Sequence, residues 1–72
     1  MNKNAVNFMK EKGDWEALFS YLYSCNEYDL IIELHTELKN RSEDISSLME
    51  IYAYDAYTYK SNPELRYKPE SF

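Results

Sequence analysis

Glycine and proline are almost missing from this chain of 72 residues. It has one glycine, and its two prolines, Pro63 and Pro69, lie within the last ten residues. All-β chains need turn residues at short, regular intervals, and residues 1–60 do not supply them. Apolar residues recur instead at helical spacing, which predicts an all-α fold.

Cysteine and histidine are equally scarce, with one of each, Cys25 and His35. They can form neither an internal disulfide nor a zinc site. One lone thiol fits a reducing compartment, so we expect a cytoplasmic protein with Cys25 as a small core residue. His35 has no nucleophile at helical spacing and is interpreted as a structural, partly buried residue. Without a glycine-rich phosphate loop either, we expect no cofactor, no metal and no enzymatic activity.

Long apolar runs and positive charge are the remaining shortages. No run approaches the roughly 20 residues that a membrane span needs, so no membrane association is expected. The formal net charge is −5, and residues 26–55 carry eight carboxylates against Lys39 and Arg41 alone. This imbalance argues against direct nucleic-acid binding, which needs cations to displace phosphate counterions. It favours a protein partner with a basic surface.

Two helices are predicted in the first part of the chain. Residues 4–12 form the first, with Ala5, Phe8 and Met9 facing inward. Gly13 ends it in the left-handed conformation, and Asp14 caps the next helix. That next helix has an apolar face with i, i+3, i+4, i+7 spacing, which Cys25 continues. The face consists of Trp15, Leu18, Phe19 and Leu22.

Two further helices follow. The third is predicted over roughly 27–39, with Asn26 as its N-cap and Asp29 completing a capping box. Its buried residues are Ile31, Leu34 and Leu38, with Leu30 and His35 beside them. Ser42 is predicted to cap the fourth, with Glu43 and Asp44 in its first turn.

Connections of one to three residues imply that successive helices pack antiparallel. We therefore predict a compact bundle of about four short antiparallel helices, arranged as stacked helical hairpins, over residues 1–60. Residues 61–72 are predicted to form a C-terminal tail that is extended or makes one turn at Asn62–Pro63.

The stretch "IYAYDAYTYK" at 51–60 holds four of the eight tyrosines. A helix fits it better than a strand. In a strand the tyrosines would change from one face to the other at Asp55–Ala56, so no single apolar face would result. On this helix, one arc is predicted to face the core: Ile45, Leu48, Met49, Tyr52, Ala56 and Tyr59. Glu50, Tyr54 and Tyr57 fall on the opposite arc. Either the tail covers this outward arc through Leu65, Tyr67 and Phe72, or the arc is a recognition surface.

Three carboxylates, Asp29, Glu33 and Glu37, recur every four residues and form an acidic stripe on the third helix. The stripe is either an ordinary solvated face or an anionic surface for a basic partner. In the second case it could imitate the charge spacing of a nucleic-acid backbone.

These features predict a small acidic, non-enzymatic binding protein that modulates or inhibits a larger partner by protein–protein contact. The composition, rich in Asn, Lys, Tyr and Ile, is similar in type to that of small phage-encoded inhibitors. A basic nucleic-acid-processing or host-defence protein would be a fitting target. The alternative is a structural homo-oligomer or adaptor subunit closed by tyrosine-rich helix contacts. The predicted partner-binding residues are Glu50, Tyr54, Tyr57, Asp29, Glu33 and Glu37.

Overall fold

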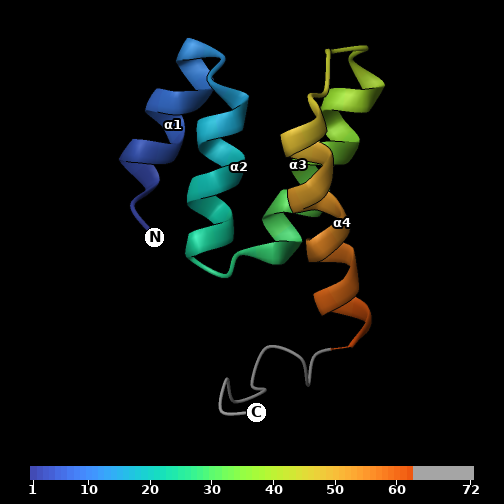
Figure 1. Ribbon diagram of the computed structural model, residues 1–72. Coiled ribbons are helices and arrows are strands. Elements are labelled where there is room, and N and C mark those ends of the chain that lie inside the picture. Colours follow the sequence, from blue (N-terminus) through green and yellow to red (C-terminus); the bar gives the residue numbers. More distant parts are fainter. Residues whose placement is uncertain (63–72) are drawn as a thin grey trace.

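The computed structural model describes residues 1–62 and contains four helices in this range. They are α1 (Lys3–Lys12), α2 (Trp15–Ser24), α3 (Tyr28–Asn40) and α4 (Ser47–Ser61). Successive helices run in opposite directions, which confirms the predicted antiparallel all-α bundle (Figure 1). The predicted tail lies outside the described residues except for Ser61 and Asn62, the last residue of α4 and its C-cap. None of the four described helices has the length and apolar character needed to cross a lipid bilayer.

The first three helices end in the same way, with one residue in the left-handed region. These residues are Gly13 at φ 70°, Asn26 at φ 59° and Ser42 at φ 59°. In each case the next residue's N–H donates to a carbonyl five residues back, as in a Schellman motif. The three bonds are Asp14 to Met9 at 3.0 Å, Glu27 to Leu22 at 2.9 Å and Glu43 to Leu38 at 3.0 Å.

The prediction that Asn26 and Ser42 begin the third and fourth helices is therefore wrong, since both residues close the helix before them. Small polar side chains suit both ends of a helix, and Asn tolerates the left-handed region well, so residue type alone is ambiguous. The N-cap of α4 is Ser46, whose Oγ accepts a hydrogen bond from the Met49 N–H at 3.2 Å. Glu27 precedes α3 without a side-chain capping bond.

Asp14 occupies the N-cap position of α2 as predicted, but its side chain makes no capping hydrogen bond. The connection between α3 and α4 covers residues 41–46 and is longer than the predicted one to three residues. Glu43 and Asp44 lie in this connection, not in the first turn of α4, where Glu50 is the acidic residue.

The core is made by one face each of α2, α3 and α4. From α2 and α3 it takes most of the aliphatic and aromatic residues that their spacing predicts, together with Tyr28 and His35, while Trp15 is half-buried beside it. From α4 it takes Met49 and two alanines, Ala53 and Ala56, which are 1% and 0% exposed. Because alanine is small, the backbone of α4 can lie close to α2 and α3 at these positions. The predicted core residues that are buried are Leu18, Phe19, Leu22, Ile31, Leu34, Leu38, Met49 and Ala56.

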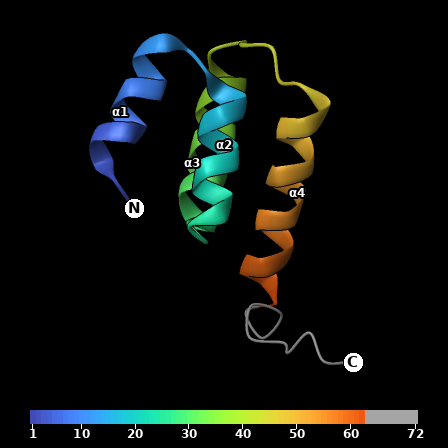
Figure 2. The same cartoon turned by 60° about the vertical axis from the view of Figure 1, so that its left-hand side comes forward.

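Helix α1 packs on α2 alone among the described helices and contributes no fully buried residue. It lies on the opposite side of the α2–α3 pair from α4 (Figure 2). Val6 and Met9 are its half-buried contacts with the core. Phe8 was predicted to face inward, but it is 58% exposed and the Lys12 Nζ lies 5.1 Å from its ring centroid. A helix with a single neighbour buries only a narrow stripe, and Phe8 lies outside it.

Candidate interaction surface

The outer side of α4 carries four large apolar side chains that are exposed to solvent. Leu48 is 42% exposed, Ile51 56%, Tyr54 69% and Tyr57 41%. Each follows the previous one by three residues, and residues at i and i+3 are neighbours on a helix surface. They form one continuous row, called here the α4 ridge. No other described helix lies beyond this side of α4 (Figure 2).

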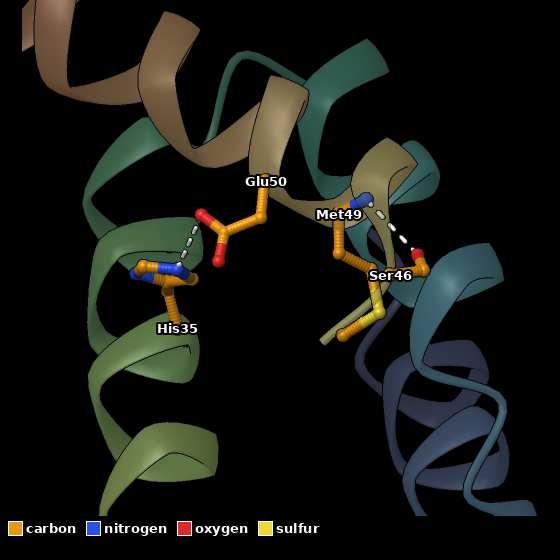
Figure 3. Close-up of polar contacts among 4 residues, drawn as sticks. All are labelled: His35, Ser46, Met49 and Glu50. Carbon is orange, nitrogen blue, oxygen red and sulfur yellow. Dashed lines mark hydrogen bonds and ion pairs between the residues drawn. The ribbon is translucent and has the colours of Figure 1, made fainter. Parts of the chain in front are cut away.

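Helical spacing from the first turn of α4 onward separates the residues that face the core from those that form the ridge. The Ser46 hydroxyl holds the first turn by accepting the Met49 N–H, and the Met49 side chain is buried (Figure 3). From there the inward sector continues through Ala53 and Ala56. Tyr54 and Tyr57 consequently point outward, as predicted from the helical spacing.

The inward sector, which is the side of α4 that faces the core, is rotated around the helix axis relative to the arc predicted from the sequence. It is centred on Met49, Ala53 and Ala56, while Tyr52 and Tyr59 are only half-buried at its edge. This rotation leaves Leu48 exposed, so the prediction that Leu48 faces the core is wrong. Bulky residues dominate the predicted arc, whereas the two most deeply buried residues of α4 are Ala53 and Ala56.

The same rotation brings Glu50 to the seam between α3 and α4, away from the outward arc predicted for it. Its Oε1 lies 3.3 Å from Nε2 of His35, whose residue is only 5% exposed. The imidazole and the carboxylate point toward each other across the seam (Figure 3). With a neutral imidazole, Nε2–H donates to the carboxylate, and Nδ1 has no hydrogen-bond partner within the described residues. Glu50 therefore contributes to the joint between two helices.

Tyr57 joins the α4 ridge to this seam. Its ring meets the His35 ring edge-on, with centroids 6.1 Å apart and an interplanar angle of 79°. Tyr54 has no such ring contact among the described residues and is the most exposed member of the ridge. Tyr57, at one end of the ridge, is therefore supported by α3, whereas the Tyr54 ring lies open to solvent.

The acidic stripe on α3 is partly neutralised by a lysine from α4 and by the arginine at the end of α3 itself. Lys60 of α4 places its Nζ 3.4 Å from Asp29, and Arg41 lies 3.3 Å from Glu37. Glu33 is exposed, and no ion pair to it is present among the described residues. Because exposed ion pairs contribute little stability, the two pairs mainly lower the charge of the stripe.

Two hollows border the acidic stripe, and Glu33 and Glu37 line both of them. One is a groove between α1 and α3, and the other is a shallow depression along the outer side of α3. The remaining lining residues are Val6, Lys10, Leu22, Leu30 and Leu34 for the groove, and Ile32, Thr36, Asn40 and Arg41 for the depression.

Tyr52 and Tyr59, predicted as core tyrosines, belong to a layer of four tyrosines that joins α2, α3 and α4. Tyr23 of α2 lies 5.1 Å from Tyr52 and 5.6 Å from Tyr28 between ring centroids. Tyr28 of α3 stacks on Tyr59 at 4.8 Å. The sequence did not reveal the roles of Tyr23 and Tyr28, because rings that meet across helices leave no local pattern.

A hydrogen bond from the Tyr23 hydroxyl to Oδ2 of Asp55, 3.1 Å long, closes this tyrosine layer. Burial of the phenol and the adjacent Asp55 carboxylate raise the pKa of Tyr23 above its usual value. The layer is a structural element of the bundle and is distinct from the α4 ridge.

Groups that could carry other chemistry are few in the described part of the chain. Cys25 is a free thiol, half-buried at the end of α2. Within residues 1–62, no three imidazole, thiol or carboxylate groups are arranged to hold a metal ion. Comparison with protein-family models, with curated proteins and with solved structures gives no match to this chain.

Proposed function

We propose that this chain is a non-enzymatic binding protein that docks on a larger protein through the α4 ridge and modulates or inhibits it. The observation that supports the proposal is the row of four exposed apolar side chains on one helix. Contiguous exposed apolar surface is typical of interaction sites, and tyrosine is enriched in binding hot spots. Tyr54 and Tyr57 would be the anchors.

The charge around the α4 ridge favours a partner with a basic surface. Glu43, Asp44, Glu50 and Asp55 lie between Ser42 and Tyr59, and this stretch has no lysine or arginine. Opposite charges on a partner would accelerate association and suppress wrong partners. A nucleic-acid-processing or host-defence protein of the cytoplasm, with a basic surface of its own, fits this requirement. Glu33 and Glu37 of the acidic stripe line the groove between α1 and α3, so they would form a second anionic surface apart from the α4 ridge.

A double substitution, Tyr54→Ala with Tyr57→Ala, tests the proposal. We expect the variant to keep its helical circular dichroism but to lose the partner in a pull-down from the native cell. Phe8→Ala is the matched control, because Phe8 is an exposed aromatic residue on α1. Partner binding that survives the double substitution in a folded protein would exclude the α4 ridge as the docking site.

A second copy of this chain is the alternative partner, since a small domain gains stability by burying an exposed apolar row against itself. Light scattering separates the two functions. A homo-oligomer predicts a particle larger than 8.7 kDa and a melting temperature that rises with protein concentration. A monomer with a concentration-independent melting temperature supports the binding protein.

A further inference from the structure

The direction of the α4 ridge limits the shape of the surface that can cover it. An α-helix turns by about 100° per residue, so each step of three residues moves the row back by about 60°. Over nine residues, from Leu48 to Tyr57, the ridge sweeps about 180° around α4 while rising about 13.5 Å. It crosses the outer half of the helix diagonally.

Contacts of neighbouring side chains locate the two ends of the α4 ridge. Leu48 precedes Tyr52 by one turn, and the Tyr52 ring packs beside Tyr23 of α2 at 5.1 Å. Tyr57 at the other end meets His35 of α3. The ridge therefore begins near the α2 edge of α4 and ends at its α3 edge.

A flat surface pressed against α4 can reach at most three neighbouring members of such a row, because all four span about 180°, and a convex helix reaches fewer. A concave surface can contact all four. From this geometry, and resting on the proposed function, we infer that the partner carries an apolar groove that receives the outer half of α4. This is the helix-in-groove mode of recognition, with the anchors wound around the helix.

The charges beside the α4 ridge indicate the chemistry of the groove walls. By helical spacing, Glu50 lies along the α3 side of the ridge and Asp55 along its α2 side. Each carboxylate has one oxygen engaged within the fold, by His35 and by Tyr23 respectively, and a second oxygen for a partner. Lysine or arginine on both walls of the groove would match this arrangement. A second copy of the chain would instead bring carboxylates against carboxylates.

Photo-crosslinking tests the groove directly. The probe residue p-benzoylphenylalanine replaces Leu48, Ile51, Tyr54 or Tyr57 in four separate variants, with Phe8 as the control position. We expect all four ridge positions, and not position 8, to crosslink to one and the same larger protein in the native cell. Mass spectrometry should place the crosslinks from positions 48 and 57 in different segments of that protein, which are the two walls.

The other outcomes are separable. Crosslinks to one protein from only two or three adjacent positions would overturn the groove while leaving the proposed binding function intact. Crosslinks to a second copy, or to residues 63–72 of the same chain, would overturn both. The absence of any crosslink from the four ridge positions would also overturn both.

Affinity measurements with the crosslinked protein provide the second test. In a groove, Leu48→Ala and Tyr57→Ala should each lower the affinity at least tenfold, although the two residues lie at opposite ends of the ridge. Phe8→Ala should leave the affinity unchanged. Glu50→Gln and Asp55→Asn should slow association severalfold at low salt and less at high salt. A loss confined to one end, or association rates indifferent to both charge changes, would contradict a basic-walled groove.

Discussion

The carboxylate of Glu50, which the sequence predicts as a partner-binding residue, also contacts His35 and joins α4 to α3 in the structure. The imidazole is almost fully buried, and its Nε2 has the Glu50 carboxylate as partner at 3.3 Å. A buried donor that loses its acceptor costs more free energy than the bond itself contributes. The contact therefore joins α4 to α3 at this position.

Removing the acceptor should reveal this role. Glu50→Ala is expected to lower the free energy of unfolding by about 1–3 kcal/mol, because the imidazole N–H is left without a partner. Glu50→Gln should stay within about 1 kcal/mol of the wild type, since its amide oxygen can still accept the bond. Urea unfolding followed by circular dichroism measures both, with the exposed Glu33→Ala as control. Equal losses for the alanine and glutamine variants would show that the contact is dispensable.

Because of Tyr23, the free energy of unfolding is expected to depend on pH in the alkaline range. The raised pKa of Tyr23 means that the folded state keeps the phenolic proton at a pH where the unfolded chain has lost it. The stability from this group is complete below about pH 10, the usual tyrosine pKa, and falls as the pH rises above it. Unfolding free energies measured from pH 8 to 11 should therefore decline less steeply in Tyr23→Phe than in the wild type. Parallel curves would mean that Tyr23 is not coupled to folding.

At the scale of the element, the ends of the helices decide where α4 begins. The motif that closes α3 uses Ser42, and the cap that opens α4 is Ser46, four residues later. Helix α4 therefore begins four residues later than predicted, and its packing against α2 and α3 decides which side faces outward.

Two serine substitutions test this assignment. Ser46→Ala should lower the free energy of unfolding by about 1 kcal/mol, because the Met49 N–H loses its acceptor. Ser42→Gly should raise it by up to about 1 kcal/mol, since glycine has no steric cost at positive φ. Thermal or urea unfolding measures both changes. A destabilised Ser42→Gly beside an unaffected Ser46→Ala would place the helix start at Ser42 after all.

Helix α1 is expected to be the least stable element, because it packs on α2 alone and buries no residue completely. Amide hydrogen exchange should show faster exchange in α1 than in the centres of α3 and α4. The centre of α2 is the internal reference, since it contacts all three other helices. Protection in α1 equal to that of α2 would show that the bundle opens as one unit.

Much of this architecture could be predicted from the sequence, and the exceptions have physical reasons. The buried faces of α2 and α3 follow from the spacing of Leu18, Leu22, Ile31 and Leu38. The spacing also separates Tyr54 from the core, because angles around one helix axis depend on sequence alone.

What the spacing could not supply is the direction in which neighbouring helices lie. That direction rotates α4 so that Glu50 turns inward and Leu48 turns outward. For the same reason, the pairing of Asp29 with Lys60 across two helices was not predicted.

At the scale of the whole molecule, helices α2, α3 and α4 share an aromatic layer, and α1 lies outside it. Tyr23, Tyr28, Tyr52 and Tyr59 join α2, α3 and α4 at one end of the bundle. A chain of this length has about 4–11 kcal/mol of stability in total. One large buried ring is therefore a considerable part of it.

Tyr28→Ala should remove about 3–5 kcal/mol, because Tyr28 is only 6% exposed and stacks within the layer. We expect a broad, early thermal transition in place of a cooperative one. Tyr54→Ala is the matched control and should stay within about 0.5 kcal/mol of the wild type, since Tyr54 is 69% exposed. A cooperative transition in Tyr28→Ala near the wild-type temperature would mean that the layer is not essential.

Ala53 and Ala56 have a consequence for how this protein can change over generations. The side of α4 that faces the bundle is filled by these alanines and Met49, so its fit does not depend on Leu48, Ile51 or Tyr54; of the four ridge residues, Tyr57 also contacts the buried His35. Substitutions at these three positions would change the proposed docking surface without disturbing the fold that presents it. A library randomised at Leu48, Ile51 and Tyr54 would therefore retain a folded scaffold, and natural descendants of a binding protein of this kind would exchange targets by the same route.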